Sequence, residues 1–124
     1  MELNSNKKIF IGALLMAIAV SLGAIGAHAL EKSLSIKQLA TFKTGVNYHF
    51  LHAIGILLLG LLEKSFSRSL SREFYIFLFG IILFSVNCYI YAITGVKDFA
   101  MLIPIGGVAY IIGWVSLSLK FYRK

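Results

Sequence analysis

Three histidines lie within or at the ends of apolar runs of this chain, where titratable groups are unusual. His28 closes the first run, and His49 and His52 stand three residues apart in the second. Residues three apart share one face of a helix, so His49 and His52 form a pair. Paired histidines can bind a metal or haem, relay protons, or hydrogen-bond to a quinone or lipid headgroup. Because polar groups are costly inside a bilayer, these residues are the first candidates for function.

Other polar residues fall at a similar depth. Tyr48 precedes His52 by four residues, and Asn87 lies in the third apolar run. With a helical rise of about 1.5 Å per residue, these side chains, His28 and Pro104 all lie within roughly 12 Å of the same membrane face. We therefore predict a ligand-binding cluster of His28, Tyr48, His52 and Asn87. The alternative is that each histidine is a structural hydrogen-bond donor.

The chain offers little for other kinds of site. A metal would need three or four ligands, and no acidic residue lies inside an apolar run to complete a set with the histidines. Cys88 with two histidines could complete one, but nothing in the sequence shows that they face one another. Cys88 is the single cysteine, so it forms no intrachain disulfide, and we expect a buried apolar group. Ser85 is expected to bond to its own helix. Because no phosphate-binding loop, carboxylate pair or nucleophile motif occurs, we predict no enzymatic activity. We also predict no metal, since the ligand set is incomplete, and no cofactor.

Composition places the chain in a membrane. Its 124 residues are 59% hydrophobic and 14% charged, against about a quarter charged in soluble domains, and the mean hydropathy is +0.86. A soluble enzyme, a disulfide-rich secreted domain and a disordered tail are thereby excluded. The net charge of +7 is scattered over connectors and chain ends. It forms no basic face, so no nucleic-acid partner is expected.

Four apolar runs are each near the roughly 20 residues that cross a bilayer. They predict a single membrane domain, an all-α bundle with spans at 9–30, 45–62, 74–94 and 99–119. The first run, followed by Ala27-His28-Ala29, also resembles a signal peptide, but its length favours a retained helix. A capping box from Ser35 to Gln38 predicts a short interfacial helix between the first two spans, feeding into the second. Asp98 is the expected N-cap of the fourth.

The distribution of lysine and arginine orients the spans. With four crossings, both termini and the middle connector share one side of the membrane. Under the positive-inside rule, the side with more Lys and Arg is cytoplasmic, so both termini are predicted there. That side holds eight of these residues and the other side four: Lys7, Lys8, Lys64, Arg68, Arg72, Lys120, Arg123 and Lys124, against Lys32, Lys37, Lys43 and Lys97.

Small residues mark faces where membrane helices approach closely. Gly23, Gly26 and Ala27 provide such a face on the first span, and Gly106 and Gly107 provide one on the fourth. We interpret both as packing within one subunit, with a dimer interface as the alternative. Next to the second face, Pro104 is expected to mark a bend.

Four segments carry a resemblance to a known family. They are GAIGAHAL at 23–30, TGVNYHFLHA at 44–53, LFS at 83–85, and PIGG at 104–107 leading to the Gly-Trp pair at 113–114. In this order they resemble the uncharacterised YgdD/YwdK-type family of small bacterial inner-membrane proteins, over nearly the whole chain. The resemblance implies a four-helix, multi-pass protein of the bacterial inner membrane, with no established activity. Members often carry another residue where His49 stands, which favours His28 and His52. The matching positions are Gly23, Gly26, His28, Gly45, Tyr48, His52, Ser85, Pro104, Gly106 and Gly107.

Two functional hypotheses follow from the sequence. The first is an accessory or assembly subunit of a larger membrane complex, whose partners are the lipid bilayer and other membrane subunits or a second copy of the chain. The second is binding or transport of a small ligand (quinone, lipid, haem or proton) at the histidine cluster in the outer leaflet.

Overall fold

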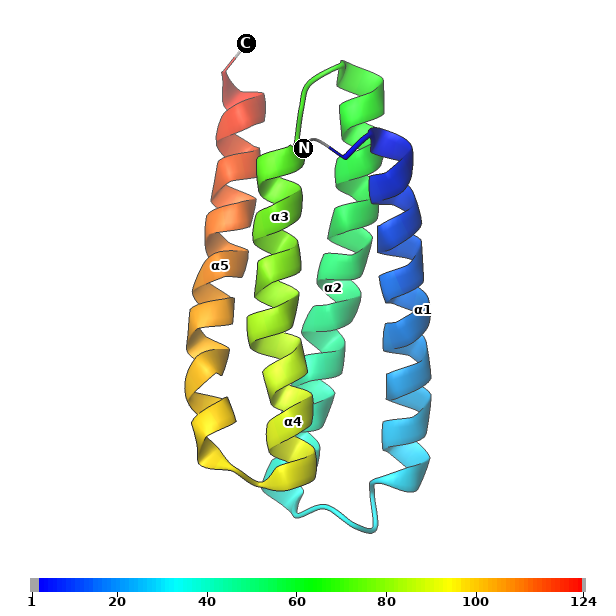
Figure 1. Ribbon diagram of the computed structural model, residues 1–124, viewed down its shortest axis with the longest axis vertical. Coiled ribbons are helices and arrows are strands. Elements are labelled where there is room, and N and C mark those ends of the chain that lie inside the picture. The colour runs from blue at the N-terminus through cyan, green and yellow to red at the C-terminus, as the bar shows by residue number, and fades with distance from the viewer. Residues whose placement is uncertain (1–2, 124) are drawn as a thin grey trace.

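The computed structural model describes residues 3–123, and in this range the ordered elements are helices (Figure 1). Four stretches are long and apolar enough to cross a membrane, as predicted. The third stretch combines α3, a six-residue π-helix (η1) and α4. The elements are α1 (Ser5–Ala29), α2 (Ile36–Phe66), α3 (Ser71–Gly80), η1 (Ile81–Val86), α4 (Asn87–Thr94) and α5 (Lys97–Tyr122).

Two helix starts differ from expectation. The capping box at Ser35 is present, with both of its hydrogen bonds to and from Gln38, but the helix that it opens runs unbroken for 31 residues. The predicted interfacial helix is therefore the beginning of α2, because nothing after the cap interrupts the helical hydrogen bonds. Asp98 lies in the first turn of α5, whose N-cap is Val96. Moreover, α5 continues through Pro104 as one helix.

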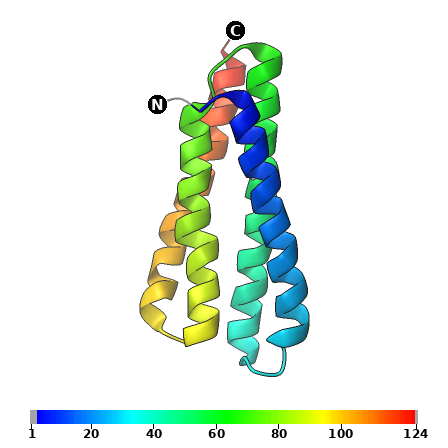
Figure 2. The same cartoon turned by 45° about the vertical axis from the view of Figure 1, so that its right-hand side comes forward.

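The helices run antiparallel, and the chain termini lie together (Figures 1 and 2). We call the end with the termini and the α2–α3 connection the terminal end, and the end with the other two connections the hairpin end. α2 packs against α1 on one side and against α3, η1 and α4 on the other, while α5 packs on the third span. α1 has α2 as its one extensive neighbour. The hairpin of α1 and α2 thus joins the rest of the bundle mainly through α2.

Glycines allow the closest helix contacts. A Cβ atom on Gly26 would lie 2.0 Å from the Phe42 ring, and one on Gly106 would lie 2.4 Å from the Phe84 backbone nitrogen. Gly23 and Gly107 have more room, since their nearest neighbours would be 3.4 and 3.8 Å from a Cβ. The small faces of α1 and α5 are thus occupied by neighbours within the chain. The side chain of Ala27 lies outside the described part of the structure.

The larger hydrophobic core fills the space between α2, the third span and α5. Its buried residues include Phe77 and Tyr110, which also form one wall of the histidine environment. A smaller core joins α2 to α4 near the hairpin end, around Phe42, Val46 and Ala92. The histidine pair on α2 lies between these two cores in sequence.

Candidate functional site

His52 is held by hydrogen bonds at both of its ring nitrogens. Nε2 accepts from Nε1 of Trp114 on α5 at 3.0 Å. Nδ1 lies 2.8 Å from the backbone oxygen of Tyr48, one turn earlier on α2. Since the indole N–H can only donate and the carbonyl can only accept, these partners assign the proton of His52 to Nδ1. The ring is therefore neutral in this arrangement.

Aromatic rings enclose the same imidazole. The Tyr110 ring stacks on it with centroids 3.4 Å apart and an interplanar angle of 8°. Phe77 meets it edge-on at 5.3 Å, and only 3% of His52 is exposed. Glycines make this packing possible, because a Cβ on Gly80 would lie 2.5 Å from the Tyr110 ring and one on Gly113 would lie 2.5 Å from Phe77.

Tyr110 links this cluster to the π-helix. Its hydroxyl lies 3.4 Å from the Ser85 hydroxyl on η1, a long hydrogen bond. Ser85 is fully buried. Our expectation that Ser85 bonds to its own helix is therefore wrong, because the wide π turn carries it opposite Tyr110.

Asn87 is committed to the backbone of the same segment. Its Nδ2 donates to the carbonyl oxygens of Ile82 at 3.2 Å and Leu83 at 2.9 Å. A π-helix disturbs the usual i to i−4 bonding and leaves such carbonyls short of donors. Asn87 thus stabilises the π turn, and it does not line the groove beside His52.

Tyr48 stands at the surface of the cluster. It is 41% exposed, and its ring contacts Phe84 at 4.7 Å between centroids. Beside it, a groove of about 440 Å³ opens on the outer surface between α2, η1 and α5. The groove is mostly apolar, and its lining residues are Tyr48, Leu51, His52, Phe84, Gly107, Tyr110, Ile111 and Trp114.

His28 does not belong to this cluster. It is exposed in the last turn of α1. Gly26, two residues earlier, packs opposite Phe42 on α2, and His52 lies ten residues further along α2, about 15 Å at the helical rise. The predicted convergence of His28 with His52 at one depth is therefore wrong, because α2 begins at Ile36 and carries His52 well past the hairpin end.

His49 is buried on another face of α2. Its Nδ1 lies 2.8 Å from the Tyr89 hydroxyl of α4. Its Nε2 is buried and has no hydrogen-bond partner among the described residues. Within residues 3–123, no group of three or more His, Cys, Asp or Glu side chains could hold a metal.

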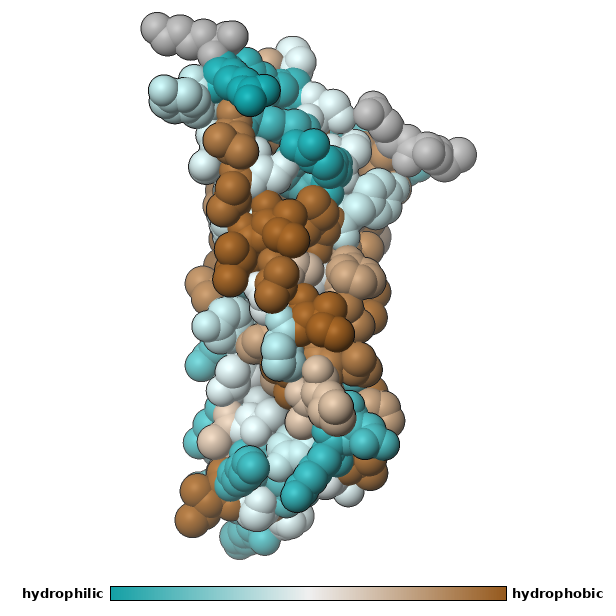
Figure 3. Space-filling model, turned by 90° about the vertical axis from the view of Figure 1, so that its left-hand side faces the viewer, coloured by the Kyte–Doolittle hydropathy of each residue, from teal (hydrophilic) through white to brown (hydrophobic). Residues whose placement is uncertain are grey.

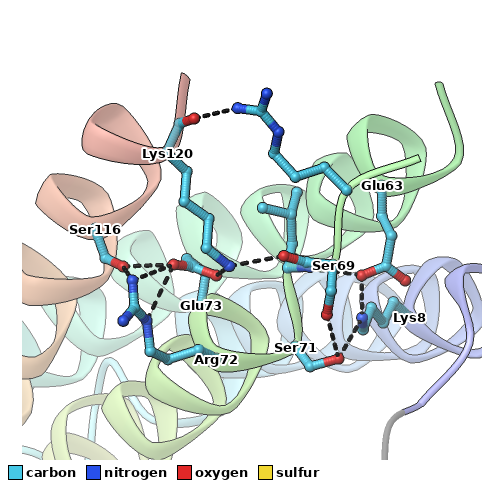
Figure 4. Close-up of polar contacts among 10 residues, drawn as sticks. Lys8, Glu63, Ser69, Ser71, Arg72, Glu73, Ser116 and Lys120 are labelled. Atoms are coloured by element: carbon cyan, nitrogen blue, oxygen red, sulfur yellow. Dashed lines mark hydrogen bonds and ion pairs between the residues drawn. The ribbon is translucent and has the colours of Figure 1, made fainter. Parts of the chain in front are cut away.

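A second polar region lies at the terminal end, around Glu63 (Figure 4). The Lys8 ammonium donates to Oε2 of Glu63 at 2.5 Å and to the Ser71 hydroxyl at 2.9 Å. The Leu70 amide also donates to Oε2 of Glu63, at 2.7 Å, and the Ser5 hydroxyl donates to Oε1 of Glu63 at 3.0 Å. Lys8 is fully buried. These contacts fasten the start of α1 to the end of α2 and the start of α3.

Glu73 forms a matching centre between α3 and α5. Its carboxylate is fully buried. Oε2 accepts from the Lys120 ammonium at 2.9 Å, whereas Oε1 accepts from the Ser116 hydroxyl and, at 3.3 Å, from the Arg72 guanidinium. Lys120 also donates to the Ser69 carbonyl at 2.7 Å.

The sequence did not lead us to predict these ion pairs. Glu63 and Glu73 flank the middle connector, where charges are normally solvated, and their lysine partners are 55 and 47 residues away. The one available signal was the position of Lys8 at the start of an apolar run, directly opposite Glu63 once the first hairpin is folded.

Comparisons with known proteins agree with this architecture. A UPF0382 membrane protein from Staphylococcus epidermidis is 39% identical over 116 residues, covering 91% of this chain and 95% of the relative. One from Staphylococcus saprophyticus is 36% identical over 115 residues, with 93% and 96% covered. The UPF0382 membrane protein YwdK of Bacillus subtilis is 38% identical over 111 residues, with 88% and 90% covered. No solved structure matches the chain.

The family model described as a protein of unknown function, DUF423, matches residues 22–107. This segment holds Tyr48, His52 and Asn87, and it ends before Tyr110 and Trp114. The resemblance found in the sequence is thereby confirmed. The chain is a membrane protein that belongs to the DUF423 family.

Proposed function

We propose that this protein is a non-enzymatic accessory or assembly subunit that acts through its helix surfaces in a larger membrane complex. The observation that carries the proposal is the contrast between the inside and outside of the bundle. Polar side chains inside it bond mainly to one another or to the backbone, which leaves few groups for chemistry, while α1 keeps most of its surface for contacts beyond the chain.

The candidate site illustrates the first half of this contrast. Both nitrogens of His52 have partners within the chain, and the amide nitrogen of Asn87 is bonded to the backbone. A haem or metal would need a free imidazole nitrogen, which His52 does not offer. These side chains therefore support structure better than catalysis.

The first helix illustrates the second half. Only 17% of its most apolar 18-residue window is buried, against 50% for α2. Its outer face carries exposed small residues at helical spacing, Ala13, Ala17 and Ser21, flanked by Leu14 and Ile18. In lipid, small residues allow close helix contacts that large ones prevent. A helix of another subunit fits this face.

Photo-crosslinking in the native membrane tests the proposal. A photoreactive amino acid at Ala17 should give one discrete adduct with a different membrane protein, whereas the same probe at Val108, which is exposed on α5, should give lipid adducts. A second substitution, Ala13→Leu, should reduce the Ala17 adduct by blocking close approach, while Ile18→Leu should not.

Native mass spectrometry of the protein extracted with its lipids provides an independent readout. The proposal requires a species heavier than one chain that contains another protein. A solitary chain whose Ala17 probe reacts only with lipid contradicts it. So does an adduct formed only with a second copy of this chain.

The groove beside His52 favours a second candidate function, binding of a small amphiphile such as a quinone or lipid tail. Its walls are aromatic and apolar, and the exposed Tyr48 offers one phenol at the rim. Ligand pockets commonly combine an apolar lining with a few polar groups. Because both ring nitrogens of His52 already have hydrogen-bond partners, the ligand would be held by ring stacking and by the Tyr48 hydroxyl.

Trp114, the single tryptophan of the chain, reports on this groove directly. A short-chain quinone that binds there should quench its fluorescence to saturation. Gly107→Leu fills the groove and should weaken binding at least fivefold, whereas Val108→Leu, outside the groove, should leave it unchanged. Quenching that rises linearly without saturation, or equally in both variants, contradicts this candidate.

A further inference from the structure

Two apolar grooves run along the third span on either side of Ile76 and meet at Arg72. One, of about 630 Å³, follows α3 past Tyr75 and Phe79 to Ile82. The other, of about 420 Å³, lies between α3 and α5. Its lining residues are Arg72, Ile76, Ile111, Ile112, Val115, Ser116 and Leu119. Apart from Arg72 and Ser116 at the mouth, the second groove is lined by aliphatic side chains.

The length of the first groove along the span is about the thickness of one leaflet of a bilayer. Arg72 lies in the first turn of α3 at the terminal end, and Ile82 is ten residues further along the span. At the helical rise this is about 15 Å, half of a hydrocarbon core of about 30 Å. The guanidinium therefore lies at headgroup level when the grooves lie at the level of the acyl chains.

The charges at the mouth leave one cation in excess. The single carboxylate of Glu73 is shared by Arg72 and Lys120. Lys120 is held at 2.9 Å and is mostly covered, whereas the Arg72 side chain is 66% exposed and lies 3.3 Å from the carboxylate. Arg72 also donates from Nη2 to the Ser116 hydroxyl at 2.7 Å and from Nε to Glu73 at 3.4 Å. These contacts do not use Nη1, which leaves donors of this exposed side chain for a further anion. The amino end of α3, which has no side-chain cap, adds its positive dipole at the same place.

The surface has the matching polarity. On the face that includes α5, hydrophilic residues gather at the terminal end, directly above a hydrophobic band (Figure 3). Ile111, Ile112 and Val115 are exposed on α5 and belong to the lining of the second groove. A molecule with an anionic head and two apolar tails fits this arrangement.

We propose that an anionic phospholipid binds here, with its phosphate on Arg72 and one acyl chain in each groove. Arginine presents a planar set of donors that suits phosphate oxygens. Basic pockets between membrane helices are known to take anionic headgroups. This binding is distinct from both functions proposed above. The outer face of α1 takes no part in it, and Ile111 is the one lining residue that the second groove shares with the groove at His52.

Native mass spectrometry in detergent with equimolar phosphatidylglycerol and phosphatidylcholine tests the charge. The wild-type protein should retain phosphatidylglycerol preferentially. Arg72→Gln should lower its retention about fivefold, the equivalent of about 1 kcal/mol for one basic side chain at a membrane surface. Arg123→Gln, which removes an exposed arginine at the same end, should change it little. Equal losses in the two variants would show unspecific surface attraction and overturn the proposal.

A second pair of variants tests the grooves without altering charge. Ile112 and Ile105 are both 52% exposed on α5, but only Ile112 lines a groove. Ile112→Trp should reduce lipid retention, and Ile105→Trp should not. Millimolar inorganic phosphate should fail to displace the lipid. Displacement by phosphate, or no effect of Ile112→Trp, would show that the acyl chains are not held and would overturn the proposal. Unchanged helix content by circular dichroism confirms that each variant is folded.

Discussion

His52 is fixed at both nitrogens, and its role at the scale of single residues follows from that. The bonds to Trp114 and to the Tyr48 backbone orient the ring, and the stacked Tyr110 covers it. A histidine in this setting connects α2 to α5 inside the bundle. It would have to give up a bond before it could take a ligand at a nitrogen.

The bond between Trp114 and His52 gives the first prediction. Trp114→Phe leaves Nε2 of His52 buried without a donor and should lower the free energy of unfolding by about 1–3 kcal/mol. The double variant with His52→Leu should lose less than the sum of the two single variants, because it leaves no orphaned acceptor. Unfolding in sodium dodecyl sulfate, followed by circular dichroism, measures both. Strict additivity would contradict the bond.

Adjacent lysines at the start of α1 give the second prediction. Lys8 is buried against Glu63, whereas Lys7 is exposed. Lys8→Met breaks a buried ion pair and should cost about 3–5 kcal/mol of unfolding free energy. Lys7→Met should cost less than about 0.5 kcal/mol. The same detergent titration compares them, and equal effects would argue against a structural role for the pair.

Some of this residue-scale picture could be predicted from the sequence. Tyr48 and His52 were expected to be neighbours because four residues separate them on one helix. The partners from other helices, Trp114 and Tyr110, could not be predicted, since the rotation of each helix about its axis is set by packing. His28 was misplaced for a related reason: its depth was counted from a predicted span boundary.

At the scale of elements, glycines bring α5 close to the third span, and Gly106 is the one among them whose Cβ would meet backbone atoms of that span. Gly106→Ala places a methyl group 2.4 Å from the Phe84 backbone nitrogen, whereas Gly107→Ala meets only the Phe84 ring at 3.8 Å. Backbone atoms cannot move aside as a side chain can, so these adjacent positions should respond differently.

We therefore predict different effects for the two substitutions. Gly106→Ala should lower the free energy of unfolding by about 1–3 kcal/mol, the typical cost of overpacking. Gly107→Ala should be neutral or stabilising by up to about 1 kcal/mol, because alanine favours helix more than glycine does. Thermal unfolding in detergent is the measurement. A stable Gly106→Ala variant would contradict the close contact.

The elements themselves were largely predictable, and their details were not. Apolar runs of membrane length gave the four spans, and the capping box located the start of α2 at Ile36. The sequence predicted that this helix feeds into the second span, but it did not predict that the two form one helix without a break. Nothing in the residues of η1 distinguishes a π turn from an α turn, because the difference lies in backbone hydrogen bonding.

At the scale of the whole molecule, both termini lie at one end, and among the described residues this end carries seven lysines and arginines against four at the other. By the positive-inside rule we predict that the terminal end is cytoplasmic. A fluorescent protein fused after residue 124 should fluoresce, and an alkaline phosphatase fused there should be inactive. A phosphatase inserted in the connection between α4 and α5 should be active. The reverse pattern would contradict this orientation.

The π-helix has a consequence for how this family can vary. A π turn accommodates one additional residue within a helix and leaves the packing on either side as it would be in a regular α-helix. In the third span the added residue falls within Ile81–Val86, where Asn87 bonds to two of the carbonyls. A relative that has lost one residue from this segment should form an ordinary α-helix there, with its flanking contacts retained and the asparagine no longer required. Single-residue gaps in this span, paired with replacement of that asparagine, are therefore the evolutionary trace to look for among the relatives.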